Sequence, residues 1–353
     1  MSATTAEAIR RRRETIVEYA MRREAALRVR LRTPEPAPDP ETELISVRSS
    51  LDFLVEALEA EEPSLFLEYL AWADAACRGH RLPPELVPIA LRALRDSVEE
   101  HLPWTEATAA AALLDSGMRA LGQGAPAPVS LLQGNPFEKL CRDYLDTLLA
   151  GDRHKAAQSI LQAVEGGLEI RELYLHLFQP VMHEVGRLWQ LGEISVAQEH
   201  FCTAATQLVM SMLYPKTFGG KRRGLRLVAT CVGQERHEIG VRMVADFFEL
   251  EGWDTYYLGA DTPTASILHA LETFGGDVLA VSTTMVYNIA ALRKLIGELR
   301  KTKIGRKAKI LVGGYPFNVV PQLWRTIGAD GSGESAEAAV ATAERLVERG
   351  GRR

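Results

Sequence analysis

The last third of the chain alternates short apolar runs with segments in which apolar residues recur at helical spacing. The apolar runs, which are typical of buried strands, are Leu225–Thr230, Asp277–Ser282 and Lys309–Gly314. The segment Gly240–Leu250 follows the first run and has the periodicity of an amphipathic helix. Strands that alternate with helices predict a parallel sheet covered by helices. Residues 219–353 are therefore expected to form a Rossmann-like or flavodoxin-like α/β domain.

The middle of the chain, residues 129–218, carries apolar residues at helical spacing. Glycines break this pattern at Gly151, Gly166, Gly167 and Gly192. The breaks predict four short helices, and each must bury its apolar face against another. A four-helix bundle is the expected arrangement.

Residues 41–128 are predicted to form a further helical domain. Its expected helices are Leu51–Leu58, Ser64–Cys77, Glu85–His101 and Thr105–Leu121. A proline-rich linker, Thr33–Pro40, precedes this domain, and a hinge rich in glycine and proline, Gly122–Pro128, forms its end. Residues 1–40 thus comprise the linker and an arginine-rich helix over 2–32, whose interleaved glutamates indicate a solvated helix.

Composition fits a chain that folds into several domains. At 353 residues, with 46% hydrophobic and 25% charged residues, the chain is long enough for two or three cores. A net charge of -5 and the lack of a helix-turn-helix pattern argue against a nucleic-acid partner. The four cysteines have no paired metal spacing and are expected to be reduced. Without an apolar run of membrane-spanning length or a signal peptide, no membrane partner is expected and the cytoplasm is the expected location.

The candidate chemistry begins in the loop after the first strand, which reads Glu235-x-His237-x-x-Gly240. In a parallel sheet this loop lies at the carboxyl edge, where ligands bind. An imidazole there could ligate a metal, and Glu235 could fix its tautomer. On its own, a loop histidine is more often an ordinary surface residue. Other residues expected at this edge are Ser282, Thr283, Met285, Gly313, Gly314, Gly259, Thr262, Tyr315 and Pro316.

The segment from about 224 to 350 resembles the cobalamin-binding domains of the methionine synthase and mutase type. The resemblance rests on the histidine loop, Ser282 and the pair Gly313-Gly314. It implies that His237 is the lower axial ligand of cobalt. It also implies that Ser282 contacts the displaced base and that the two glycines make room for the nucleotide tail. Glu235 stands where the family commonly has aspartate, and Thr284 where it commonly has leucine.

A second resemblance concerns the predicted bundle. Trp189 is followed by nine residues and then by Glu199-His200, a spacing similar to that in the cap of light-responsive adenosylcobalamin photoreceptors. The resemblance implies that Trp189 packs on a 5'-deoxyadenosyl group and that the polar pair hydrogen-bonds it. Taken without the neighbouring domain, a core tryptophan and a solvated Glu-His pair are the commoner case. Gln190 stands where the repressors of this group carry a histidine.

The helical domain before the bundle resembles globin-like sensor modules, and the order of domains is similar to that of photocobilins, which pair cobalamin with biliverdin. A bilin site would combine arginines with aromatic and apolar residues. The candidates are Trp72, Arg78, His80, Arg92, Arg95, His101 and Trp104. Each of them could equally well only pack or face water.

These resemblances predict a light-sensing signalling protein that binds adenosylcobalamin and biliverdin. Its partners would be further copies of itself, associating in a light-dependent way, and an unknown downstream protein. The alternative is a cobalamin-dependent methyl carrier that serves methyltransferases, since such carriers also place a helical bundle before the cobalamin domain. A cobalamin-free scaffold is a third option. The sequence shows no acid-base or nucleophile constellation, so we do not expect an enzyme.

Overall fold

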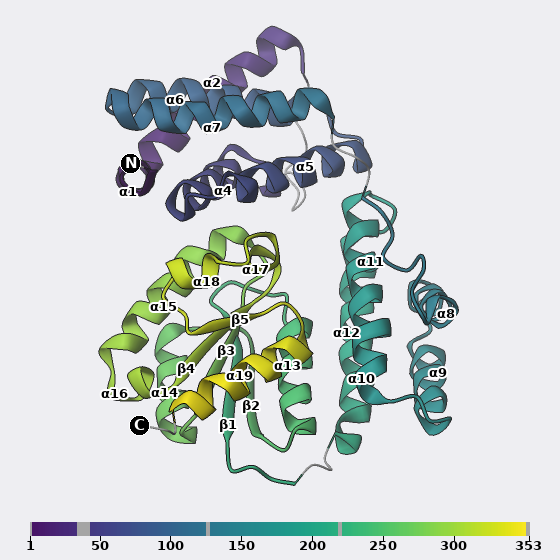
Figure 1. Ribbon diagram of the computed structural model, residues 1–353. Helices are drawn as coiled ribbons and strands as arrows, with labels where there is room; N and C mark the ends of the chain where they lie inside the picture. The colour runs from purple at the N-terminus through teal and green to yellow at the C-terminus, as the bar shows by residue number, and fades with distance from the viewer. Residues whose placement is uncertain (1, 34–42, 125–127, 218–220, 351–353) are drawn as a thin grey trace. The chain divides into compact units, whose positions relative to one another are not determined.

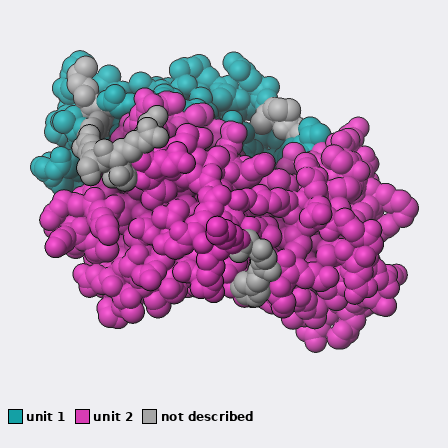
Figure 2. All heavy atoms as spheres, turned by 60° about the horizontal axis from the view of Figure 1, so that its bottom comes forward, with its two compact units in different colours: residues 1–129, 188–193 teal, residues 130–187, 194–353 magenta. Residues whose placement is uncertain are grey.

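The structure is a computed structural model that describes residues 2–33, 43–124, 128–217 and 221–350 (Figure 1). The predicted linker from residue 34 onward and residues 125–127 of the predicted hinge lie outside the described residues. The chain divides into two compact units (Figure 2). Unit 1 comprises residues 1–129 and 188–193, and unit 2 comprises residues 130–187 and 194–353. The expected fold class, helical in its first part and α/β in its last, is confirmed.

Unit 1 is helical. Its helices are α1 (Ser2–Arg11), α2 (Arg13–Leu31), α4 (Val47–Ala60), α5 (Pro63–Gly79), α6 (Leu86–His101) and α7 (Trp104–Gln123). Helix α5 begins with Pro63 in its first turn, where a missing N–H costs no hydrogen bond. The core is formed by apolar residues from all of these helices, including Leu51, Phe66 and Leu94, which are fully or almost fully buried.

The arginine-rich stretch differs from the prediction of one solvated helix. It is divided at Arg12, and both parts pack on the rest of the unit through buried residues such as Ile9 and Ile16. The arginines pair with acidic residues of the neighbouring helices. The guanidinium of Arg13 donates to both carboxylate oxygens of Asp52, at 3.0 and 2.9 Å. The prediction was wrong because the alternation of charges along the stretch hid a narrow apolar stripe.

Unit 2 begins with the bundle. Its helices are α8 (Glu138–Leu149), α9 (Arg153–Glu165), a continuous rod of α10 (Ile170–Leu173), a π-helical turn η1 (Tyr174–Phe178) and α11 (Gln179–Gln190), and α12 (Val196–Leu213). A capping box starts α12, in which Ser195 and Gln198 bond each other's backbone N–H groups. The short 3-10 turn η2 (Tyr214–Lys216) ends the bundle.

The second part of unit 2 is an α/β domain. Its elements are β1 (Arg226–Val232), α13 (Ile239–Leu250), β2 (Asp254–Thr262), α14 (Thr264–Phe274), β3 (Val278–Ser282), η3 (Val286–Asn288), α15 (Ile289–Lys301), α16 (Lys303–Lys307), β4 (Lys309–Gly313), α17 (Tyr315–Val319), α18 (Leu323–Thr326), β5 (Gly331–Gly333) and α19 (Ala336–Gly350). The described strands pair in parallel in the order β2-β1-β3-β4-β5. Helices α13 and α19 cover one face of the sheet, and α14 and α15 cover the other (Figure 1). This order is that of flavodoxin-like sheets.

Buried contacts join the bundle to α13 within unit 2. The hydroxyl of Tyr174, in the π-helical turn, donates to Asp246 at 2.8 Å. The ring of Tyr174 lies 6.2 Å from that of Phe247, and the guanidinium of Arg171 lies 5.5 Å from the centre of the Phe247 ring. The bundle is thus fixed to the helix that follows the predicted histidine loop.

The cysteines Cys77, Cys141, Cys202 and Cys231 are all buried and free. None of the described helices is both long enough and apolar enough to cross a membrane.

Candidate functional site

The histidine loop lies at the point where the strand order of the sheet reverses. His237 follows β1, and Thr283 follows β3, the strand beside it. Because the crossovers from β1 and β3 leave toward opposite sides, their loops diverge and leave room for a ligand at the carboxyl edge. Both loops were predicted from the sequence to lie at this edge.

Glu235 is fully buried and holds the two loops together. One carboxylate oxygen, Oε2, accepts hydrogen bonds from the backbone N–H of Thr284 at 2.8 Å, from that of Met285 at 2.9 Å and from the amide of Asn288 at 3.1 Å. The other oxygen, Oε1, accepts from the backbone N–H of His237 at 3.1 Å and lies 2.5 Å from its Nδ1. Five contacts therefore satisfy one buried carboxylate.

These contacts set the protonation of the pair. Burial alone would raise the pKa of Glu235, but the hydrogen bond and charge of His237 and the backbone N–H groups outweigh it and lower the pKa to about 2. Burial opposes the charged imidazole, yet the hydrogen bond and charge of Glu235, and the charge of Glu199, raise the pKa of His237. Nδ1 faces Glu235, and the His237 side chain is 59% exposed. Its Nε2 is therefore free to bind a metal.

Two residues without side chains, Gly313 and Gly314, lie at the same edge of the sheet. Gly314 has a φ of 107°, and a Cβ there would fall 2.1 Å from the carbonyl oxygen of Thr283. Gly313 pairs with Ser282, and a Cβ on it would lie 3.0 Å from the carbonyl oxygen of Gly333. The hydroxyl of Thr283 is buried and has no hydrogen-bond partner among the described residues. A free imidazole nitrogen, a glycine-lined edge and an unsatisfied hydroxyl fit the lower face and tail of a cobalamin.

Residues that the sequence analysis missed support the loop from β2. Tyr257 donates its hydroxyl to Oε2 of Glu238 at 2.7 Å, and the backbone N–H of Ala260 donates to the same oxygen at 3.0 Å. The predicted residue Gly259 lies in a bulge between them with a φ of 82°, and Thr262 is buried at the end of the strand. In the sequence, the only indication that Glu238 belongs to the site was its position directly after His237.

The remaining predicted residues at this edge occupy varied positions. Gly240 is exposed in the first turn of α13, and Met285 is half-buried beside Glu235. Tyr315, at the start of α17, is 47% exposed, whereas Pro316 is buried.

The residues predicted to cover the cofactor are separated between the two units. Glu199 lies in the first turn of α12 and accepts a hydrogen bond from Thr203 at 3.0 Å, and His200 follows it and is exposed. Trp189 belongs to unit 1, where its ring lies 6.2 Å from that of Trp72 and 5.9 Å from that of His80. The role of Trp189 above a corrin stays a prediction.

Only two of the bilin candidates gather around Trp189. His80 Nε2 lies 2.9 Å from the carbonyl oxygen of Trp189, and Gln190 donates to the carbonyl oxygen of Trp72 at 3.1 Å. The other candidates are engaged elsewhere or exposed: Arg78 pairs with Asp74, Arg95 with Asp115, His101 packs on Tyr19, and Arg92 and Trp104 are exposed. The structure therefore does not assemble the predicted set into one site.

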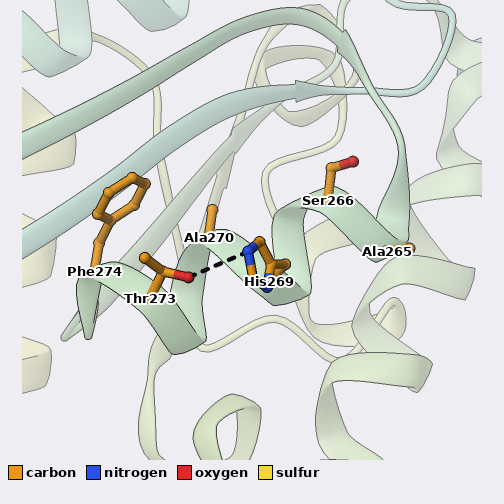
Figure 3. Close-up of a pocket in the computed structure, with 6 residues that line it drawn as sticks. All are labelled: Ala265, Ser266, His269, Ala270, Thr273 and Phe274. Atoms are coloured by element: carbon orange, nitrogen blue, oxygen red, sulfur yellow. Dashed lines mark hydrogen bonds between the residues drawn. The ribbon is translucent and has the colours of Figure 1, made fainter.

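A pocket of about 380 Å³ lies on α14 (Figure 3). Its lining includes Ser266, His269, Thr273 and Phe274, and Thr273 and His269 are 3.4 Å apart through Oγ1 and Nε2. It contains none of the predicted cobalamin residues.

Comparison with known proteins identifies the α/β domain and the bundle. Residues 225–341 match the family model described as B12 binding domain, and residues 140–214 match a second model with the same description. The chain contains a B12-binding domain. The predicted cobalamin cofactor is thereby supported, whereas its adenosyl form and the biliverdin are not.

The B12-binding domain and its bundle also have curated relatives. The chain is 24% identical over 216 residues to a dimethylamine corrinoid protein of Methanosarcina barkeri, covering 60% of this chain and 98% of that protein. It is 26% identical over 207 residues to trimethylamine corrinoid protein 2 of Methanosarcina acetivorans, covering 58% and 94%. The solved monomethylamine corrinoid protein of Methanosarcina barkeri shares the fold, with a TM-score of 0.52 and 22% identity over 59% of this chain and 99% of that chain.

These relatives contradict the expected light-sensing function. The two curated relatives above are named as a dimethylamine and a trimethylamine corrinoid protein. The prediction was wrong because it rested on a short motif, a tryptophan followed at fixed spacing by Glu-His, whose members belong to different units of the structure. The light-dependent self-association predicted with it is likewise unsupported.

Proposed function

We propose that this chain is a cobalamin-dependent methyl carrier that serves methyltransferases. The observation that supports the proposal best is the buried Glu235, which accepts from Nδ1 of His237 and leaves Nε2 free at the edge of the sheet. The corrinoid names of the relatives point the same way. The part of the chain before residue 140 lies outside both family matches and would be an addition to the carrier.

In this proposal the protein's residues hold and tune the cofactor. His237 would bind cobalt, and Glu235 would raise the basicity of the imidazole by holding its Nδ1 proton. Gly313 and Gly314 would admit the tail, and the hydroxyl of Thr283 would bond a polar group of it. When bound, cobalamin supplies a cobalt centre that takes up a methyl group and gives it away.

We further propose that the chain is a carrier and not itself an enzyme. The residues at the site would bind the metal, position its ligand or leave room for the cofactor. The activation of a methyl donor or acceptor would belong to partner methyltransferases. Methylcobalamin would then be the form in use, and adenosylcobalamin is the alternative that the experiment below separates.

The test is reconstitution of the full chain with methylcobalamin and, separately, with adenosylcobalamin. We expect methylcobalamin to bind at least as tightly as adenosylcobalamin. In wild-type protein whose histidines carry the heavy nitrogen isotope, the cobalt(II) form should show the doublet splitting of one heavy nitrogen by electron paramagnetic resonance, which distinguishes His237 from the triplet given by the cofactor's own base. The His237→Ala variant should lose this splitting and bind at least about ten-fold more weakly. Arg236→Ala, a change at the exposed neighbouring residue, should alter neither. Binding of adenosylcobalamin with exclusion of methylcobalamin would overturn the proposal.

A further inference from the structure

The carboxylate of Glu238 accepts three hydrogen bonds, although the residue is only half-buried. Its Oε2 accepts from the hydroxyl of Tyr257 and from the backbone N–H of Ala260, at 2.7 and 3.0 Å. Its Oε1 accepts from Nε2 of Gln207 at 2.8 Å. Hydrogen bonds to a charged acceptor are stronger than neutral ones, so these contacts fix the carboxylate.

The side chain does not serve its own helix. Glu238 is the N-cap residue of α13, yet its carboxylate makes no capping bond, and only its carbonyl oxygen takes part in the helix by accepting from Arg242. The carboxylate instead turns toward β2 and α12. A Cβ on Gly259 would lie 3.3 Å from Oε2, so the bulge in β2 leaves just enough room for this approach.

Gln207 makes this a link between the bundle and the histidine loop. It lies in the middle of α12, while Glu238 adjoins His237 in the chain. One helical turn farther along α12, Ser211 accepts a hydrogen bond from Arg242 at 2.7 Å. Both bonds join α12 to the α/β domain, but only the bond from Gln207 reaches a residue next to the predicted cobalt ligand.

We propose that Glu238 is a positioning residue that transmits the position of α12 to His237. With α12 in place, the bond from Gln207 completes the fixation of the loop and holds the imidazole where it can bind cobalt. When α12 moves, Glu238 keeps only its bonds to β2 and the loop gains freedom. The inference rests on the proposed function for its use, because a methyl carrier must open its bundle to partner enzymes. Its geometry is independent of that function.

The first test needs no cofactor. Amide hydrogen exchange of the apo protein is compared for the wild type, Gln207→Ala and Ser211→Ala. Loss of one net hydrogen bond of about 1 kcal/mol should raise the exchange of the His237 and Ala260 amides about five-fold in Gln207→Ala. Ser211→Ala, which breaks the matched contact, should leave these amides unchanged. Equal exchange in both variants would overturn the inference.

The second test uses cobalamin in its cobalt(II) form. In protein whose histidines carry the heavy nitrogen isotope, the fraction of molecules that show the doublet splitting reports how often His237 is bound, because the cofactor's own base gives a triplet. Relative to the wild type, the ratio of His-bound to His-free cofactor should fall about five-fold in Gln207→Ala and stay constant in Ser211→Ala. Glu238→Gln, which keeps the length and can still bond, should recover much of the ratio lost in Glu238→Ala.

The outcomes separate the two proposals. A wild type that binds cobalamin through His237, together with a Gln207→Ala variant that does so equally well, would overturn the role of Glu238 and leave the carrier proposal standing. A wild type that does not bind cobalamin would overturn the carrier proposal and the proposed role toward cobalt.

Discussion

The side chain of Glu235 uses both of its carboxylate oxygens on the protein itself. Oε1 bonds only within the histidine loop, whereas Oε2 bonds only to the segment after β3. The chain separation to Thr284 is 49 residues. One residue thus joins the loop that would bind cobalt to the loop that would line the tail. Glutamate, which is one methylene longer than the aspartate common in the related domains, reaches both loops.

Substitution of Gly240 can distinguish an effect on cobalamin binding from an effect on the stability of the fold. A Cβ on this residue would meet nothing within 4 Å in the protein. Because alanine is favoured over glycine in a helix, Gly240→Ala should raise the free energy of unfolding by about 0.5 kcal/mol. If a corrin lies against this turn, the added methyl group should weaken cobalamin binding at least about ten-fold, which corresponds to 1.4 kcal/mol.

Gly297 is the matched control, because it lies in α15 and a Cβ there also meets nothing within 4 Å. Gly297→Ala should stabilise the protein to the same extent and leave cobalamin affinity unchanged. Denaturant titration of the apo protein and equilibrium binding of cobalamin measure the two effects. Unchanged affinity in Gly240→Ala would show that the cofactor does not approach this turn.

At the scale of elements, the π-helical turn Tyr174–Phe178 positions the contact between the bundle and α13. Such a turn holds one residue more than an α-helix would, which changes the direction of the side chains around it. Here it directs Tyr174 to Asp246, which is 5% exposed. Burial raises the pKa of Asp246 to about 6, and the nearby Glu249 acts in the same direction, against the hydrogen bond of Tyr174 and the charge of Arg242.

This pKa predicts a pH-dependent term in stability. Because the pKa of Asp246 in the folded protein lies above its ordinary value of 3.8, its contribution is fully present below that value and is lost as the pH rises through about 6. Asp246→Asn cannot titrate. The difference in unfolding free energy, variant minus wild type, should therefore grow by about 2 kcal/mol between pH 4 and pH 7.

Chemical denaturation at several pH values measures this difference. Tyr174→Phe provides a second variant, because it removes the hydrogen bond that lowers the pKa of Asp246. In that background the step should move to higher pH. A difference between Asp246→Asn and the wild type that does not change with pH would contradict the assignment of the step to Asp246.

At the scale of the whole molecule, the chain leaves unit 2 at Arg187, contributes residues 188–193 to unit 1 and returns at Ile194. Within unit 1 this segment lies against the end of α5 with no space to spare. A Cβ on Gly79 would fall 2.4 Å from the carbonyl carbon of Leu191, and one on Gly192 would fall 2.5 Å from the carbonyl oxygen of Gly79. Two glycines therefore allow the two backbones to meet.

Gly79→Ala should displace the segment, because both clashing groups are backbone. Overpacking of this kind costs about 1–3 kcal/mol, so amide exchange within residues 188–193 should rise at least about five-fold. Gly122→Ala, in the last turn of α7, is the control, since a Cβ there meets nothing within 4 Å. Equal exchange of the segment in both variants would show that the close contact with Gly79 does not hold it.

The sequence predicts local structure better than contacts between distant segments. Strands and helices followed from periodicity, since each depends on neighbouring residues. For example, the strand expected over 225–230 is β1, at Arg226–Val232. The pairing of Glu235 with His237 was also predicted, because the two are close in the chain. The donors Asn288 and Gln207 were not, since they come from distant segments and have side chains of ordinary type. Periodicity also could not place residues 188–193, because their neighbours in unit 1 are more than a hundred residues away.

Under the proposed carrier function, the burial of the cysteines would have a chemical consequence, because the methyl group carried would be electrophilic. A thiolate is the side-chain nucleophile that would most readily intercept such a group, and it forms only when the thiol can ionise. Burial raises the pKa of Cys77 to about 12 and those of Cys141 and Cys202 to about 11, and it raises the pKa of Cys231 as well. The four buried thiols would thus stay protonated, so under the proposed function a methyl group in transit would not be lost to them.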